Sequence, residues 1–227
     1  MKQKFTILFD LDGTLVYTAP DLMLAHNHVM KKFGYPTKST EDIRNLVGKG
    51  AGALIGRSIW GQAKKEFSKV LDAKIKDEMV KEFVNFYGKN IVNESTLVTG
   101  VKDFLIWCKE QNISMAVCTN KQEHLSNDLL KKIGIYDFFE YVEGSDTFDY
   151  CKPDPRHLTN VVEILDGNVK KTIMIGDSET DANAAKAAEI PVILLENGYT
   201  EKNTTEIYHN NLIKDFIGIE KIISKYL

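Results

Sequence analysis

The sequence of 227 residues predicts an α/β protein, a doubly wound parallel sheet with a helical cap domain inserted after its first strand. Short apolar runs without strict alternation recur along the chain, as in strands that are buried on both faces of a parallel sheet. Segments with helical periodicity separate these runs, and such alternation implies helices on both faces of the sheet. The stretch between the first run and the second is far longer than one crossover helix requires, which indicates an insertion.

The elements of the predicted core follow one another in a regular order. Four apolar runs are predicted to be strands: Phe5–Phe9, Ile113–Cys118, Thr172–Ile175 and Val192–Leu195. Four amphipathic segments are predicted to be helices: Val101–Gln111, Gln122–Ile133, Pro155–Leu165 and Glu179–Ala188. Ligands of open parallel sheets bind beyond the carboxyl ends of the strands. We therefore expect the polar residues that directly follow these runs to share one crevice.

The inserted stretch has only helical patterns, over Asp21–Phe33, Gly52–Trp60 and Lys64–Tyr87. In the last of these, apolar residues recur every three or four positions and mark one face of a long helix. These residues are Leu71, Ile75, Met79, Phe83 and Phe86. We predict a catalytic core of residues 1–14 and 93–227 and a helical cap of residues 15–92.

Composition limits the partners of the chain. The formal net charge is -3, so no overall basic field attracts nucleic acid or an anionic membrane. No apolar stretch reaches the roughly 20 residues of a membrane span, and the beginning of the chain does not resemble a secretory signal. The three cysteines lack metal or redox spacing and are expected to be free thiols. We expect a cytoplasmic monomer or homodimer that binds neither nucleic acid nor membranes.

Two acids, Asp10 and Asp12, follow the first predicted strand. Such a pair is costly unless a cation neutralises it, and Mg²⁺ prefers carboxylate oxygen. One carboxylate can act as a nucleophile that forms an aspartyl-phosphate, and the second can exchange a proton with the leaving alcohol and the attacking water. An ordinary turn, with Asp12 and Thr14 as turn or cap residues, explains the same residues without chemistry.

Thr119 and Asn120 follow the second predicted strand, and Lys152 lies in a later loop. The hydroxyl of Thr119 and the neighbouring backbone amides suit phosphate oxygens, but the pair also suits the cap of the next helix. Lys152 either neutralises the crowded acids and binds phosphate as a point charge, or is a surface lysine before a capped helix.

Asp177 follows the third predicted strand and is a candidate for the further metal carboxylate. Four residues later comes Asp181, which has the spacing of a capping box that begins at Ser178. Whether Asp181 also orients the surroundings of a metal ion or has only this structural role is left open by the sequence.

The order of these groups resembles the motifs of the haloacid dehalogenase superfamily of phosphohydrolases. The matching segments are Asp10-Leu11-Asp12-Gly13-Thr14-Leu15, Thr119, Lys152 and Gly176-Asp177-Ser178-Glu179-Thr180-Asp181. The resemblance implies that Asp10 is the nucleophile and Asp12 the general acid/base. It implies Mg²⁺ as cofactor, bound by Asp10, by Asp177 and by the backbone carbonyl of Asp12. The resemblance implies that Thr119 and Lys152 hold the phosphoryl group, and Asn120 is expected to bind substrate beside them.

The insert is similar to the helical cap of the phosphoglycolate phosphatase-like branch, and residues 47–52 resemble that branch's substrate-facing loop. Within it, Lys49 and Gly50 are expected to bind substrate, although that branch often has an uncharged residue at the position of Lys49. Arg57 either reaches a substrate carboxylate or is a solvated helix residue. We expect a magnesium-dependent phosphatase for a small phosphorylated metabolite, phosphoglycolate in particular. The alternatives are a sugar-phosphate mutase, a phosphatase for pyrophosphate, sugar phosphates or nucleotides, and an inactive phosphate-binding module.

Overall fold

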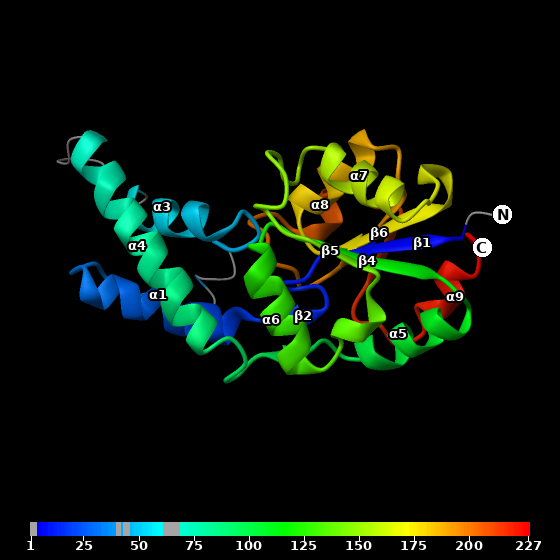
Figure 1. Cartoon of the computed structure of the whole chain (residues 1–227), viewed down its shortest axis with the longest axis horizontal. Coiled ribbons are helices and arrows are strands. Elements are labelled where there is room, and N and C mark those ends of the chain that lie inside the picture. The colour runs from blue at the N-terminus through cyan, green and yellow to red at the C-terminus, as the bar shows by residue number, and fades with distance from the viewer. Residues whose placement is uncertain (1–3, 40–41, 43–45, 61–68) are drawn as a thin grey trace.

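A six-stranded parallel sheet forms the centre of the molecule's larger part (Figure 1). The computed structural model describes residues 4–39, 42, 46–60 and 69–227. The strands of this sheet are β1 (Thr6–Phe9), β4 (Ser114–Cys118), β5 (Tyr141–Glu143), β6 (Thr172–Gly176), β7 (Val192–Leu195) and β8 (Asn211–Ile213). Their order is β5-β4-β1-β6-β7-β8, and every neighbouring pair is parallel. The predicted fold class is thereby confirmed.

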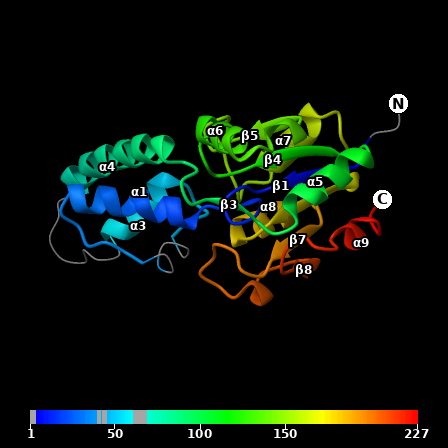
Figure 2. The ribbon, with the colours of Figure 1, turned by 90° about the horizontal axis from the view of Figure 1, so that it is seen from below.

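Helices cover both faces of this sheet, as Figures 1 and 2 show. One face carries α5 (Val101–Glu110) and α9 (Glu220–Ile223), the other carries α7 (Arg156–Ile164) and α8 (Glu179–Ala187), and α6 (Glu123–Ile133) follows β4. In strand β1, Ile7 and Phe9 belong to one apolar cluster and Leu8 to another. The strand is therefore buried at every position, because each of its two faces meets a separate core.

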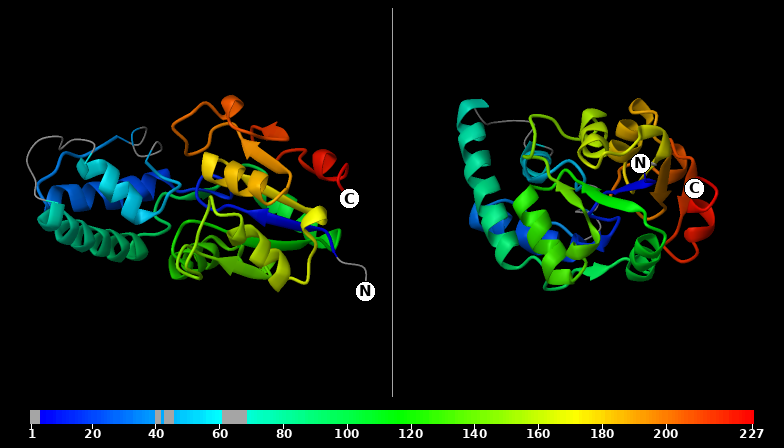
Figure 3. Two further views of the ribbon diagram at one scale, coloured as in Figure 1. Left: turned by 90° about the horizontal axis from the view of Figure 1, so that it is seen from above. Right: turned by 45° about the vertical axis from the view of Figure 1, so that its right-hand side comes forward.

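The described part of the insert includes α1 (Ala19–Lys32), α3 (Ala51–Trp60) and α4 (Lys69–Lys89), which lie together beyond one end of the sheet (Figures 1 and 3). Met79 and Phe83 of α4 are buried, as the apolar stripe predicted. The helix predicted over residues 64–87 includes two parts that lie outside the described part of the chain. These are residues 64–68 and the side chain of Leu71. The other predicted strands and helices begin and end within two residues of the observed ones.

A two-stranded antiparallel ribbon carries the chain into and out of the insert, with β2 (Val16–Tyr17) paired to β3 (Thr96–Leu97). Beside it, Asp21 is fully buried in the first turn of α1. Its carboxylate accepts hydrogen bonds from the backbone N–H groups of residues 93–95 and from the hydroxyl of Ser95. The two crossings between core and insert are thus tied to each other.

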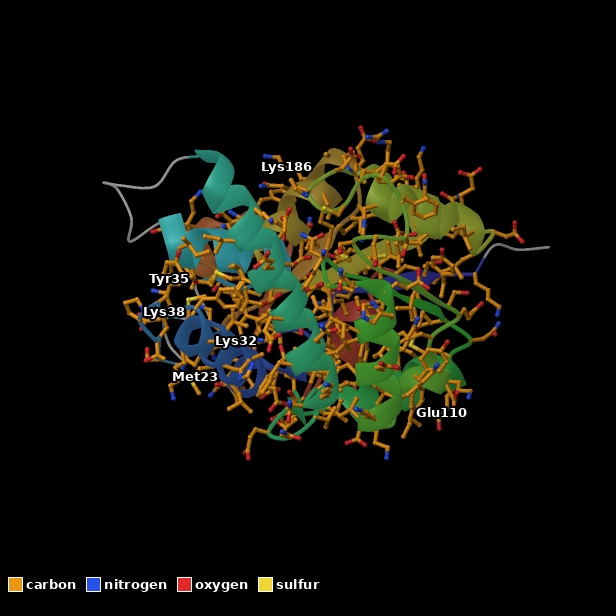
Figure 4. All side chains as sticks on the ribbon, turned by 60° about the vertical axis from the view of Figure 1, so that its left-hand side comes forward. Met23, Lys32, Tyr35, Lys38, Glu110 and Lys186 are labelled. Atoms are coloured by element: carbon orange, nitrogen blue, oxygen red, sulfur yellow. The ribbon has the colours of Figure 1, made fainter. Side chains whose placement is uncertain are left out.

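Charged side chains lie at the surface of both parts. In Figure 4, Lys186 of α8 and Glu110 of α5 lie at opposite edges of the core, while Lys32 and Lys38 lie on the side of the insert. Within the described ranges, no helix has the length and apolar character needed to cross a membrane.

Candidate active site

Polar residues from three strands meet at the carboxyl edge of the sheet. Strand β1 pairs in register with β4 and β6, so that Phe9 lies level with Val117 and Ile175. The residues that follow these positions include Asp10, Thr119 and Asp177, which are all buried. The sheet therefore brings the three predicted groups to one place. The Thr119 hydroxyl oxygen accepts a hydrogen bond from the backbone N–H of Lys121 at 3.2 Å.

Lys152 lies among the carboxylates. Its Nζ atom is 2.7 Å from Oδ1 of Asp10 and 2.6 Å from Oδ1 of Asp181, and its side chain is 1% exposed. Burial acts to lower the pKa of Lys152, but the charges of Asp10 and Asp181 outweigh it and hold that pKa above its ordinary value. Burial raises the pKa of Asp10 to about 6, although Lys152 acts to lower it. Lys152 is therefore a buried, charged partner of the acids and not a surface lysine.

Asp10, Asp177 and Asp181 form a cluster in which one carboxylate oxygen from each lies within 4.8 Å of the others. Burial, together with the charges of Asp10 and Asp181, raises the pKa of Asp177 well above its ordinary value. A bound cation reduces the repulsion within such a cluster, because it stabilises the charged form of the carboxylates. Carboxylate oxygens are also the ligands that Mg²⁺ prefers, so the donor set fits this ion.

The three carboxylates differ in how many acceptor positions they have left. Asp181 accepts four hydrogen bonds, from Lys152, from the backbone N–H groups of Asp177 and Ser178, and from the Ser178 hydroxyl. Three of these bonds fall on Oδ2 and the one from Lys152 falls on Oδ1, so most of the roughly four acceptor sites of this carboxylate are occupied. Asp10 accepts one bond from the described side chains, and Asp177 accepts one on each oxygen. Asp10 and Asp177 therefore keep capacity for a cation, while Asp181 fixes Lys152 and the start of α8.

The turn after β1 packs directly on Asp177. Gly13 has φ +87°, and a Cβ atom at this position would lie 2.3 Å from Oδ2 of Asp177. Only glycine allows this approach. The Thr14 hydroxyl donates to Oδ1 of Asp177 at 3.1 Å, and the Tyr199 N–H donates to Oδ2 at 2.6 Å. The Tyr199 hydroxyl accepts hydrogen bonds from the N–H groups of Thr18 and Ala19. Tyr199, which the sequence did not single out, thus connects Asp177 to the start of the insert.

Asp12 lies outside the cluster of three aspartates, and its carboxylate pairs with Lys121. Nζ of Lys121 is 2.8 Å from each carboxylate oxygen of Asp12 and 4.4 Å from the ring centre of Tyr87 in α4. Both Asp12 and Lys121 are buried. Lys121 was not predicted as a site residue, although it adjoins Asn120. The role of the Asp12 backbone carbonyl as a metal ligand stays a prediction.

A crevice of about 240 Å³ lies between the carboxyl edge of the sheet and the insert. Its polar lining includes Asp10, Asp12, Thr119, Asn120 and Lys121, and its apolar lining includes Leu22, Val47, Val80, Phe83 and Leu125. The loop of Gly48, Lys49 and Gly50 also lines it. The core therefore contributes most of the polar residues of the crevice, and the insert contributes most of its apolar residues.

The predicted substrate-binding residues of the loops have different surroundings. The Asn120 side chain donates to the carbonyl oxygens of Gly48, at 3.1 Å, and Lys152, at 3.0 Å, so it joins the insert loop to the core. Lys49 is exposed at the crevice. Arg57 is not among the residues that line the crevice, and its Nη1 atom lies 3.2 Å from a carboxylate oxygen of Glu201.

Comparison with known proteins places this arrangement in a family. The sequence matches the haloacid dehalogenase-like hydrolases over residues 7–195. A phosphoglycolate phosphatase of Caulobacter vibrioides is 38% identical over 216 residues, which cover 95% of this chain and 89% of that protein. The phosphoglycolate phosphatase of Nitrosococcus oceani is 32% identical over 226 residues, 99% of each chain.

A solved structure gives the same result. The crystal structure of a predicted phosphoglycolate phosphatase from Haemophilus somnus 129PT has a TM-score of 0.89 and 31% sequence identity, and the match covers 98% of this chain and 99% of that one. The sequence match includes strands β1, β4, β6 and β7 and the acids that follow β1 and β6. As the order of its motifs predicted, the chain belongs to the family of haloacid dehalogenase-like hydrolases.

Proposed function

We propose that this hydrolase is a magnesium-dependent phosphatase that acts on a small phosphate monoester, with Asp10 as nucleophile. The observation that carries the proposal is the setting of Asp10, which lines the crevice while a buried Lys152 holds only one of its two oxygens. The second oxygen is left for attack on phosphorus. Lys152 lies where it neutralises charge that arrives with the phosphoryl group.

The reaction has two steps on the residues of this chain. In the first, Asp10 forms a bond to phosphorus while the ester bond breaks, and Asp12 gives a proton to the leaving oxygen. In the second, Asp12 takes a proton from the attacking water, which displaces Asp10 and releases phosphate. Thr119 and Lys152 hold the phosphoryl oxygens. Asp10, Asp177 and the backbone carbonyl of Asp12 would hold Mg²⁺, which would supply positive charge to offset the gathered negative oxygens.

The insert supports a small substrate, for which phosphoglycolate is our leading candidate. Drug-sized ligands occupy pockets of about 300–1,000 Å³, and the present crevice is smaller, at about 240 Å³. In the predicted division, residues 15–92 act as a cap over a core of residues 1–14 and 93–227. Lys49 and Gly50 on the cap loop then face the leaving group. The relatives named phosphoglycolate phosphatase lend the same support.

The test is the release of inorganic phosphate in the presence of Mg²⁺. We expect kcat/KM for phosphoglycolate to exceed the values for pyrophosphate, a hexose phosphate and a nucleoside monophosphate. A rival that exceeds phosphoglycolate about tenfold, which corresponds to about 1.4 kcal/mol, contradicts the substrate assignment. Formation of an isomer in place of phosphate release identifies a mutase.

The contribution of the cap loop is tested with one substitution and a matched control. Lys49→Ala removes the exposed cation of the crevice, whereas Lys81→Ala removes an exposed lysine of α4 that does not line it. We expect Lys49→Ala, and not Lys81→Ala, to narrow the preference for phosphoglycolate. An unchanged ranking of substrates shows that this loop is not the selector.

A further inference from the structure

Lys121 is a buried cation of the crevice for which the two steps above have no use. It follows Asn120 at the carboxyl end of β4 and lines the crevice together with Asp10 and Asp12. Its side chain is only 5% exposed. A lysine is rarely buried to this extent unless it is paired, so its position requires an explanation.

The ammonium group of Lys121 is held from two sides. Asp12 accepts from it with both carboxylate oxygens at 2.8 Å, and the ring of Tyr87 lies 4.4 Å away, within the range of a cation–π interaction. An ammonium group has three N–H donors, of which the Asp12 carboxylate takes two. A cation fixed in this way loses little conformational freedom when it binds an anion, which favours affinity.

The position of Asp12 limits where the substrate lies relative to Lys121. To protonate the leaving group, Asp12 must come within about 2.6–3.2 Å of the ester oxygen. Since Nζ of Lys121 is 2.8 Å from both Asp12 oxygens, the ester oxygen lies within about 6 Å of that ammonium group. A carboxylate on the carbon next to the ester oxygen is then within reach of Lys121.

We propose that Lys121 recognises a carboxylate next to the ester oxygen. The substrate class is thereby narrowed to phosphate esters of 2-hydroxy acids. The proposal rests on the phosphatase function and deepens it. The substrate carboxylate and Asp12 share one ammonium group, so the charge that identifies the substrate also adjoins the residue that protonates the leaving oxygen.

Other cations near the crevice are less suited to this role. Lys152 is engaged by Asp10 and Asp181, and Arg57 is paired with Glu201 away from the crevice lining. The described residues that line the crevice include two lysines, Lys49 and Lys121. Lys49 is exposed, so solvent screens its charge more strongly than that of the buried Lys121.

The experiment compares two esters that differ in one group. Phosphoglycolate has the carboxylate, and the phosphate ester of glycolamide has a neutral amide of the same shape. The ratio of kcat/KM for the acid to that for the amide isolates recognition of the charge, because a general effect of Lys121 on Asp12 falls on both esters and cancels. We would measure kcat and KM with both esters for wild type, Lys121→Met, Lys121→Gln and Lys121→Arg.

We expect the wild-type enzyme to prefer the acid and Lys121→Met to lower the ratio by about tenfold to a hundredfold, mainly through KM for the acid. Lys121→Arg, which keeps the charge, should recover most of the preference. Lys131→Met is the matched control, since Lys131 lies 4.7 Å from the ring centre of Tyr136 but does not line the crevice. This variant should keep the wild-type ratio.

The outcomes separate this inference from the proposed function. If the wild-type enzyme hydrolyses phosphoglycolate and the Lys121→Met variant keeps the full ratio, the proposed role of Lys121 is overturned. The proposed phosphatase function is then unaffected. Lys121→Gln decides the same point where Lys121→Met does not fold, as judged by circular dichroism. A wild-type ratio near one overturns the inference whatever the variants do. Release of phosphate from neither ester overturns the substrate assignment together with the inference.

Discussion

The ammonium group of Lys152 lies 2.7 Å from Oδ1 of Asp10, and both side chains are shielded from solvent. This contact fixes the rotation of the Asp10 carboxylate, so that its other oxygen has a defined direction. It also supplies a positive charge beside the atom that we propose attacks phosphorus.

Replacement of Asp10 by asparagine should abolish phosphate release, since an amide cannot serve as the carboxylate nucleophile. We expect the fold of Asp10→Asn to survive, as measured by circular dichroism and thermal melting. In wild type, intact-mass analysis of quenched reactions should detect an aspartyl-phosphate that maps to Asp10. Near-normal turnover by the variant contradicts the mechanism.

Replacement of Asp12 by asparagine should have an effect that depends on the leaving group. With an alkyl phosphate, whose alkoxide needs a proton, we expect a loss of about 10²- to 10⁴-fold in kcat. With p-nitrophenyl phosphate the first step should suffer less, and the phosphoenzyme should accumulate. Stopped-flow measurement of p-nitrophenolate release tests this, and equal losses with both substrates argue against proton transfer by Asp12.

The stabilising effect of Mg²⁺ should increase with pH. Burial raises the pKa of Asp10 from 3.8 to about 6 and also raises that of Asp177, so the folded metal-free protein binds protons more tightly than the unfolded chain. Its stability therefore falls as pH rises through this window, from about 4 to about 6. Mg²⁺ competes with these protons and favours the charged carboxylates.

We accordingly expect Mg²⁺ to raise the melting temperature more at pH 7 than at pH 5, and Asp177→Asn to lose most of this gain. Activity should also depend on Mg²⁺, and Ca²⁺ should inhibit because its looser coordination misplaces the nucleophile. Differential scanning fluorimetry at the two pH values measures the first effect. Equal shifts at both, or full activity in excess chelator, contradict a metal site at Asp10 and Asp177.

Glu143 and His157 lie close together, with 3.4 Å between Nδ1 and Oε1, yet they should not form an ion pair at neutral pH. Burial raises the pKa of Glu143 to about 8, although Lys152 acts to lower it, and burial lowers the pKa of His157 to about 4. Both groups are therefore uncharged at pH 7. Because the folded-state pKa of Glu143 is raised, its contribution to stability is lost as pH rises from 4.5 towards about 8.

Glu143→Gln should remove this pH dependence, since the amide is neutral at every pH. Relative to wild type, we expect the variant to gain about 1–3 kcal/mol in the free energy of unfolding between pH 5 and pH 9, conditions chosen to bracket the titration. Urea unfolding at both pH values measures this. Glu140→Gln, at an exposed position, is the control and should show no such gain. A constant difference between Glu143→Gln and wild type shows that Glu143 does not titrate in this range.

The insert should move as a lid, and Asn120 should hold its loop in the closed position. Asn120→Ala removes the hydrogen bonds to the carbonyls of Gly48 and Lys152, so we expect faster hydrogen exchange across residues 47–52 and a lower kcat/KM. In wild type, a substrate analogue should slow exchange at residues 16–19 and 90–99, the two crossings. Identical exchange in the free and bound forms excludes a moving lid.

The interior strands of the sheet could be predicted because they are buried along their whole length and each contains at least three successive apolar residues. The edge strands β5 and β8 could not, since each has only three residues and includes a polar one, Glu143 or Asn211. An edge strand pairs with a neighbour on one side only, so fewer of its residues need to be buried and apolar. A segment of three residues is too short to show a recognisable pattern of apolar and polar residues.

The same distinction applies to the site. Asp10, Thr119 and Asp177 follow predicted interior strands, so their meeting follows from the parallel topology. The contact of Lys121 with Tyr87 depends on how the insert packs on the core, and that of Tyr199 with Asp177 depends on a loop after β7. Neither local periodicity nor motif spacing encodes such packing.

Strand β1 pairs with both β4 and β6, with Thr6 opposite Ser114 and Thr172. This register sets the positions of the side chains that follow the strands, although these side chains lie outside the sheet. Successive residues of a strand point to opposite sides and advance by about 3.3 Å. Deletion of one residue within β1 would therefore displace Asp10 and turn its carboxylate away from Lys152, while every reacting residue remained in the chain. The position of Asp10 thus depends on the number of residues in the strand, and a change in the length of β1 should be as damaging to activity as the loss of Asp10 itself.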